Sequence, residues 1–259
     1  MARWTRVALI LGGGLLAVVA VPVGAVASAF VGLSPIADGT TLAAHTKAVK
    51  DGYVSSFLID VGGGARALVD AGNDPTGAAI DAALKAEGLT RDAVVAVFLT
   101  HGHPDHVAAC GGFPKATVYA GAPERALLEG RASPLGPLPR LFGASKAPCG
   151  TFTDVADDAI VPVGETSARA YALPGHTAGS TAWLLRGVLF FGDAASATSG
   201  GEVQSAPWVF SDDVAEDTRS LVALSDRIGA TKPDVQALAF AHTGSLPPDA
   251  LAAFAAKHR

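Results

Sequence analysis

Residues 94–106 read VVAVFLTHGHPDH, an apolar run followed at once by three histidines and an aspartate. The apolar part is short, continuous and rich in β-branched residues, which predicts a buried strand. His101 and His103 would diverge by about 200° on a helix, so they can converge on one ion only from a strand end or a loop. Gly102 and Pro104 favour such a loop. This stretch therefore predicts a metal site at the end of a strand.

Further candidate ligands follow predicted strands elsewhere in the chain. His176 lies in the stretch PGHTAGS, Asp193 ends the stretch FFGD, and His242 follows an apolar run that ends at Ala241. Loops at strand ends can gather on one rim of a fold and there carry function. We therefore expect these side chains to join the histidines of 101–106 in one site.

These motifs, in this order, resemble the metallo-β-lactamase-fold hydrolase superfamily. The resemblance covers about residues 45–259 and includes Asp70, an aspartate that follows an early strand. It implies an α/β fold, a four-layer αββα sandwich with a dinuclear metal site on one edge. The β-helix-β order of predicted elements also favours layered α/β packing.

The resemblance further implies two divalent metal ions. The first would be held by His101, His103 and His176, and the second by Asp105, His106 and His242. Asp193 would bridge both ions, and Asp70 would orient a metal-bound histidine from outside the ligand set.

The ligand types suit zinc, with iron or manganese as alternatives. Two divalent ions would lower the pKa of a bridging water and supply a hydroxide nucleophile near neutral pH. Asp105 is the predicted catalytic proton carrier. A metal-dependent hydrolase is thus the predicted activity.

Differences from the sequence patterns of known subfamilies narrow the range of expected substrates. Metallo-β-lactamases resemble the chain but carry Cys or Ser in place of Asp193, although one group has a stretch close to PGHTAGS. Acyl-homoserine lactonases share the ligands but carry Tyr where this chain has Ser196. The expected substrate is a small molecule with an ester, lactone, thioester or related bond. The alternatives are a β-lactam hydrolase, a mono-iron sulfur dioxygenase and a noncatalytic, membrane-tethered binding module.

The N-terminus, residues 1–33, predicts a signal peptide or a membrane anchor. Arg3 and Arg6 precede an uncharged run over 7–33, which could tether the chain to a membrane. The positive-inside rule then places the rest outside the cytoplasm, whether periplasmic, secreted or anchored. Residues 36–259 are expected to form one hydrolase domain.

Composition excludes other classes of function. The chain has 259 residues, 49% of them hydrophobic, and a formal net charge of −5, so it can bury a large core but has no general attraction for nucleic acids. Cys110 and Cys149 could form one disulfide or remain two buried thiols. The segments 133–148 and 206–210 are the expected walls of a substrate pocket. The sequence does not indicate an oligomeric state.

The apolar patterns also predict the regular elements. Strands are expected at 56–61, 67–70, 94–99, 117–119, 168–173, 181–185, 188–191 and 235–241, and helices at 76–87, 123–128, 213–228 and 248–257.

Overall fold

The computed structural model describes residues 29–36 and 38–259. The chain divides into two units at Gly32, and Leu33–Arg259 forms the unit that carries every predicted site residue. Residues 1–28 of the predicted leader lie outside the described part. Within the described part, no helix is both long and apolar enough to cross a bilayer.

The larger sheet has seven strands in sequence order, β1 to β7. The first four form an antiparallel meander, and β4 to β7 run parallel to one another. The strands are β1 (Thr41–Leu42), β2 (Thr46–Asp51), β3 (Val54–Gly62), β4 (Ala65–Val69), β5 (Val94–Phe98), β6 (Thr117–Gly121) and β7 (Thr153–Val155).

The second sheet has five strands in the order β14-β11-β10-β9-β8, and a separate pair is formed by β12 and β13. In the second sheet only the pair β11 and β14 is parallel. The strands are β8 (Ile160–Val163), β9 (Thr166–Ala172), β10 (Thr181–Leu185), β11 (Val188–Phe190), β12 (Ala195–Ala197), β13 (Val203–Ser205) and β14 (Ala237–Ala239).

The two sheets pack face to face over a shared apolar core. Phe57 on β3 lies 5.0 Å from Phe190 on β11, and Phe98 on β5 lies 4.8 Å from Trp183 on β10, between ring centroids. All four side chains are buried. Because side chains alternate along a strand, each sheet has a second face that also needs cover.

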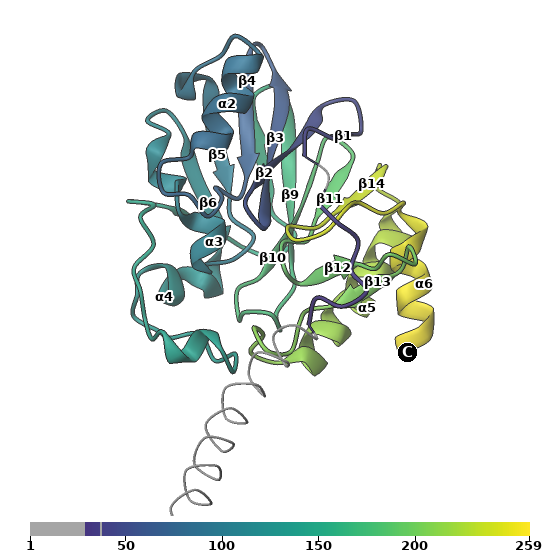
Figure 1. Cartoon of the computed structure of the whole chain (residues 1–259). Coiled ribbons are helices and arrows are strands. Elements are labelled where there is room, and N and C mark those ends of the chain that lie inside the picture. Colours follow the sequence, from purple (N-terminus) through teal and green to yellow (C-terminus); the bar gives the residue numbers. More distant parts are fainter. Residues whose placement is uncertain (1–28, 37) are drawn as a thin grey trace, which may run out of the picture. The chain divides into compact units, whose positions relative to one another are not determined.

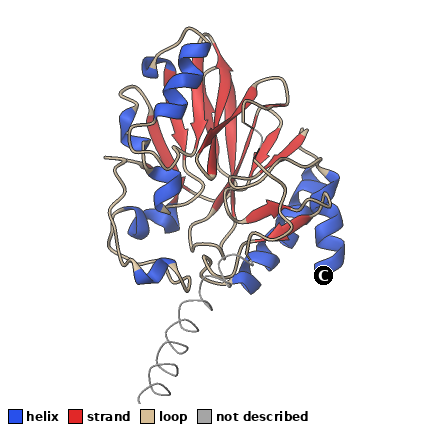
Figure 2. Ribbon diagram, in the orientation of Figure 1, coloured by secondary structure: helices blue, strands red, loops and turns tan. Residues whose placement is uncertain are grey.

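Helices cover these outer faces (Figure 1). Leu58 and Leu68 of the large sheet pack with Ile80 and Leu84 of α2, while the outer face of the small sheet packs against α5 and α6. The longer helices are α2 (Ala78–Ala86), α5 (Val214–Thr231) and α6 (Asp249–His258). Figure 2 shows the strands between the two helical flanks. The predicted α/β sandwich is confirmed, with its layers in the order helix, sheet, sheet, helix.

Short helices connect the strands near the site. They are α3 (Pro104–Val107), α4 (Arg125–Leu128), and the 3-10 helices η1 (Arg91–Ala93), η2 (Cys110–Gly112), η3 (Ala122–Glu124) and η4 (Pro139–Leu141). Most predicted elements are present, with shifted ends: the strand expected at 235–241 is the shorter β14. Strand β2 was not predicted, because lysines and an aspartate interrupt its alternation of buried and exposed residues.

Cys110 and Cys149 form a disulfide. Both sulfur-bearing side chains are buried in the core under the large sheet. The bond closes a loop of 39 residues between η2 and the segment before β7. Of the two interpretations left open by the sequence, the bridge is the correct one.

Candidate metal centre

All predicted site residues lie at one edge of the sandwich. Asp70 and the 101–106 stretch follow the parallel strands β4 and β5, which end in register at Val69 and Phe98. In the other sheet β11 and β14 end in register at Phe190 and Ala239, and Asp193 and His242 each come three residues later. Parallel pairing thus brings residues that are far apart in sequence to the same edge.

Three histidines converge first, and we call them the triple-histidine group: His101, His103 and His176. His176 Nε2 lies 3.2 Å from His101 Nε2 and 3.1 Å from His103 Nδ1. All three rings are buried, and their facing nitrogens lie within 4.8 Å of one another. The loop geometry predicted from Gly102 and Pro104 is present, since His103 has extended backbone and Pro104 begins α3.

A second set, the mixed group, consists of Asp105, His106 and His242. His242 Nε2 lies 3.4 Å from Asp105 Oδ2, and His106 Nε2 lies 3.8 Å from the same oxygen. The helix turn of α3 places Asp105 and His106 side by side, and the loop after β14 supplies His242. Their ligand atoms also lie within 4.8 Å of one another.

Asp193 lies between the two groups. Its Oδ1 is 3.2 Å from both His106 Nε2 and His242 Nε2, and its Oδ2 is 3.8 Å from His176 Nε2. The preceding Gly192 has φ 56°, and a Cβ there would lie 2.3 Å from Thr100 Oγ1. Only glycine therefore lets this loop approach β5 closely enough to place the carboxylate.

Asp70 holds two of the histidines through a chain of hydrogen bonds. Its Oδ1 accepts from Thr100 N at 2.8 Å, and its Oδ2 accepts from Thr100 Oγ1 at 2.8 Å and from His106 Nδ1 at 2.9 Å. Because the Thr100 hydroxyl donates to Asp70, it accepts from His101 Nδ1, 3.1 Å away. Both imidazoles are thereby protonated on Nδ1, which leaves Nε2 free to bind a metal.

Two of the remaining three histidines, His242 and His176, are fixed in the same way by different partners. His242 Nδ1 donates to the backbone oxygen of Tyr53 at 2.8 Å. His176 Nδ1 lies 3.0 Å from Ser211 Oγ, whose own proton goes to Pro207 O at 2.8 Å. Each acceptor therefore fixes the ring so that Nε2, and not Nδ1, faces the site. His103 differs, because it turns Nδ1 toward the site.

Burial and neighbouring charges shift the pKa values of the histidines in opposite directions. Burial, together with neighbouring imidazoles, lowers the pKa of His101 well below its usual value, and burial lowers the pKa of His103 to about 4 and of His176 to about 3. Burial also lowers the pKa of His242, but Asp193 and Asp105 outweigh it and raise the value to about 10. The triple-histidine group is thus neutral. In the mixed group, by contrast, the carboxylates of Asp105 and Asp193 lie beside His106 and His242.

These atoms fit divalent metal ions. His106 Nε2 and Asp193 Oδ1 are buried and make no well-formed hydrogen bond within the described part of the chain, although they face each other. Neutral imidazole nitrogens and carboxylate oxygens are ligands that zinc accepts. A cation would satisfy lone pairs that the protein itself leaves unmatched, and a second cation would be close enough to share Asp193.

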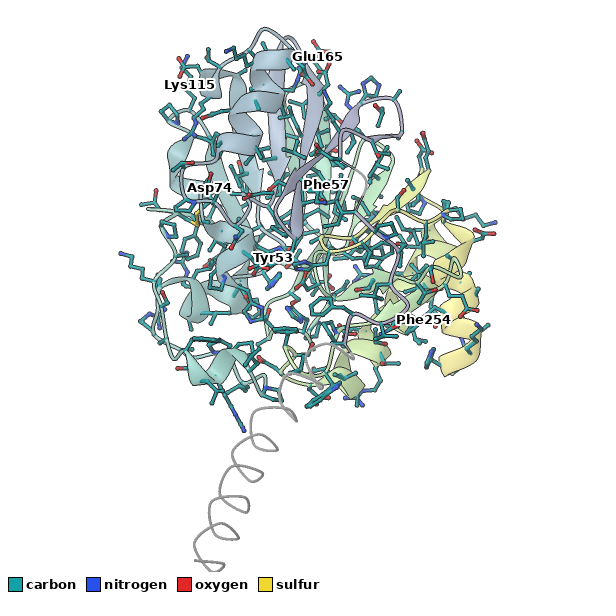
Figure 3. The ribbon with its side chains drawn as sticks, in the orientation of Figure 1. Tyr53, Phe57, Asp74, Lys115, Glu165 and Phe254 are labelled. Carbon is teal, nitrogen blue, oxygen red and sulfur yellow. A yellow bond between two sulfur atoms is a disulfide. The ribbon has the colours of Figure 1, made fainter. Side chains whose placement is uncertain are left out.

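Four supporting residues escaped prediction from the sequence: Thr100, Ser211, Tyr53 and Glu124. Thr100 and Ser211 orient histidines, as described above. Tyr53 precedes β3 (Figure 3) and stacks its ring on His242 with centroids 5.8 Å apart, while remaining 60% exposed. Glu124 is a buried carboxyl, and burial raises its pKa to about 7. Thr100 directly precedes His101 in the sequence, whereas only the tertiary structure brings Ser211, Tyr53 and Glu124 to the site, and no spacing in the sequence marks those three.

The two predicted pocket walls are joined to each other and to His176. Leu138 N donates to Val209 O at 2.9 Å, which ties the 133–148 loop to the 206–210 segment. Asp212 N donates to His176 O at 3.0 Å and so anchors the second segment beside the triple-histidine group. Trp208, on the second segment, is 52% exposed.

Comparisons with known proteins agree with this geometry. The family model of the metallo-β-lactamase superfamily matches residues 49–240. The chain therefore belongs to the metallo-β-lactamase superfamily, and it is a metal-dependent hydrolase in the general sense of that superfamily. Its members use divalent metals, typically zinc. No curated protein matches the chain significantly.

Several solved structures share the fold. Metallo-β-lactamase SMB-1, bound to 2-mercaptoethanesulfonate, is similar with a TM-score of 0.62 and 25% identity, over 87% of this chain and 94% of that one. A metallo-β-lactamase family protein from Thermus thermophilus has a TM-score of 0.62 and 24% identity, over 83% and 78% of the two chains. Rm3 metallo-β-lactamase has a TM-score of 0.64 and 20% identity, over 90% and 94%. The last two show the fold alone.

Proposed function

We propose that the chain hydrolyses an ester, lactone, thioester or related bond in a small molecule, with one divalent ion in the triple-histidine group and one in the mixed group. The observation that carries this proposal is the position of Asp193, whose Oδ1 lies 3.2 Å from two histidines of the mixed group while its Oδ2 faces His176 at 3.8 Å. A single carboxylate in this position can be shared by two ions.

The ions would supply an activated water and polarise the acyl oxygen of the substrate. The chain supplies positioning and proton transfer. Asp105 is the proposed proton carrier, because its side chain is 18% exposed and its Oδ2 lies 3.4 Å from His242 Nε2. It therefore reaches both the reaction site and solvent, which a buried carboxylate could not do.

The surroundings of the site favour a substrate with an apolar or planar portion. Tyr53 exposes its ring beside His242. Trp208 is also exposed, and it lies three residues before Ser211, whose hydroxyl contacts His176. Aromatic faces of this kind bind apolar groups and exclude water. Each metal group thus has an exposed aromatic side chain on a neighbouring segment.

A β-lactam is the second candidate substrate. Its support is the similarity to SMB-1, at 25% identity over 87% of this chain. The Asp193 position speaks against it, because the β-lactamases that the sequence resembles have Cys or Ser there. We therefore rank β-lactam hydrolysis below ester and lactone hydrolysis.

An extracytoplasmic location forms part of the proposal. Arg3 and Arg6 before the uncharged run 7–33 support it, and so does the disulfide between Cys110 and Cys149. Disulfides persist in oxidising compartments and are rare in the cytosol. Membrane fractionation of cells that express the full chain would test both the location and the tether.

The test of the activity is metal analysis together with a substrate panel. The purified chain, His101→Ala and Asp193→Ala are analysed for metals and assayed with a chromogenic ester, a lactone, a thioester and a β-lactam. We expect about two zinc ions per chain and hydrolysis of the first three substrates, with both reduced in the variants. One iron with no hydrolysis would favour oxygen chemistry, and absence of metal would favour a binding module.

A further inference from the structure

Glu124 is a buried carboxyl that none of the steps above uses. It ends η3, immediately after β6, and its side chain is 1% exposed. Burying a carboxyl is costly unless its oxygens accept hydrogen bonds. The partners of Glu124 should therefore reveal what its burial achieves.

Its two oxygens accept three hydrogen bonds from two different loops. Oε1 accepts from Gly102 N at 2.7 Å. Oε2 accepts from Gly179 N at 2.9 Å and from Thr177 Oγ1 at 2.9 Å. Gly102 separates His101 from His103, and Thr177 follows His176 directly. One side chain thus connects the two loops that together carry the triple-histidine group.

Both loops have a glycine where they approach Glu124, and the absence of a side chain there leaves room for this contact. A Cβ on Gly179 would lie 2.2 Å from Glu124 N and 2.5 Å from its Oε2. A Cβ on Gly102 would lie 3.2 Å from Glu124 Oε1. Backbone N–H groups can only donate, so both oxygens of residue 124 must act as acceptors. A carboxylate meets this requirement, whereas an amide would turn a donor toward one of the loops.

The mixed group is held by separate contacts. His106 is oriented by Asp70, and His242 by the backbone of Tyr53. Neither contact passes through Glu124. Loss of Glu124 should therefore affect the two groups unequally.

We propose that Glu124 is a positioning residue that sets the distance between the 101–103 loop and His176, and so determines the metal affinity of the triple-histidine group alone. This inference rests on the proposed two-metal site. Glu124 is not a catalytic residue, because it touches no ligand atom. It acts through the backbone of the loops that present the histidines.

The test is a zinc titration against a chromophoric chelator, with the full chain and Glu124→Gln. The matched control is Glu129→Gln, just beyond α4, where the carboxylate pairs with Arg125 and Arg131 at the surface. His103→Ala and His242→Ala identify which binding step belongs to which group. We expect Glu124→Gln to weaken the step lost in His103→Ala by about 10-fold or more, and to leave the other step and the control unchanged.

Three results would overturn the proposal: unchanged affinity in both steps, equal weakening of both steps, or weakening only of the step lost in His242→Ala. If Glu124→Gln does not fold, Thr177→Val decides, since it removes one of the three hydrogen bonds and should weaken the same step to a smaller degree. A wild type that binds two zinc ions but hydrolyses no substrate would refute the proposed activity and leave the positioning role to be judged on the affinities. If the wild type binds one ion only, the two-metal proposal fails, and Glu124 is judged by whether that ion is lost with His103→Ala and weakened by Glu124→Gln.

Discussion

Asp70 and His106 form a fully buried pair, in which Asp70 Oδ2 accepts from His106 Nδ1 at 2.9 Å and neither side chain is more than 1% exposed. Asp70 has φ 59°, a left-handed backbone conformation that most side chains avoid and that aspartate tolerates better than most. Asp70 also accepts two hydrogen bonds from Thr100. The pair thus links β4, β5 and the mixed group in one buried network.

Asp70→Asn is expected to weaken metal binding by about 10-fold to 100-fold. The amide can accept on one side only, so it cannot satisfy Thr100 N, the Thr100 hydroxyl and His106 Nδ1 together. Competition with a chelator measures the affinity. Asp92→Asn, which changes an exposed carboxylate paired with Lys115, is the control. Equal affinities in the two variants would show that Asp70 does not orient His106.

Asp193→Asn is expected to bind fewer than two ions and to lose at least about 100-fold in hydrolysis. The amide carries no charge to share between the two groups, and burial would leave its NH₂ beside His106 and His242, which lie 3.2 Å from Oδ1. Metal content and turnover of the ester substrate measure the two effects. Retention of two ions with full turnover would refute a shared role for Asp193.

Removal of the disulfide should destabilise the fold without changing the metal stoichiometry. The bond spans 39 residues, and the entropy of an open loop of that size corresponds to about 4 kcal/mol. Denaturant unfolding of the Cys110→Ala/Cys149→Ala double variant measures the loss. Because neither cysteine is among the candidate ligands, loss of metal in a folded double variant would contradict this expectation.

Asp217 predicts a specific pH dependence of stability. It is fully buried on α5, and burial raises its pKa to about 8, although its Oδ2 accepts from Ala206 N at 3.0 Å. The folded-state pKa of Asp217 lies above the unfolded-state value, so protonation of this carboxyl favours the folded state. The contribution of protonation to the free energy of unfolding is complete below about pH 4 and is lost as the pH rises through 8.

The corresponding measurement compares the wild type with Asp217→Asn between about pH 5 and 9. The free energy of unfolding of the wild type, relative to the variant, should fall by about 1.4 kcal/mol per pH unit up to about pH 8. Asparagine cannot ionise, and it keeps an oxygen for Ala206 N. Parallel pH profiles for the two proteins would contradict the assignment.

Much of this molecule could be predicted from its sequence because the decisive signals are local. The apolar run that ends at Leu99 and the histidines after it fix both a buried strand and a cluster of ligands within a few residues. The same pattern, an apolar strand followed by a polar residue that can bind metal, identified Asp193 and His242. The structure places all the predicted ligands at one edge. Strands such as β2, in which charged residues interrupt the apolar ones, were not recognisable in this way.

The supporting contacts depend on distances that no local pattern encodes. Glu124 meets Gly179 across 55 positions of sequence, and His242 meets the backbone of Tyr53 across 189. Likewise, the sequence left the state of Cys110 and Cys149 open, and only their proximity in the core decides it.

The sequence by itself thus determined the order of strands and helices and the identity of the candidate ligands, because apolar periodicity and ligand chemistry are properties of short segments. The four-layer sandwich and the division of the ligands between two ions came from the resemblance to the metallo-β-lactamase-fold superfamily. The tertiary structure decided which nitrogen each histidine turns toward the site. It also decided which buried carboxyls connect the ligand-bearing loops, because these contacts depend on how the parallel strands of two sheets end at a common edge.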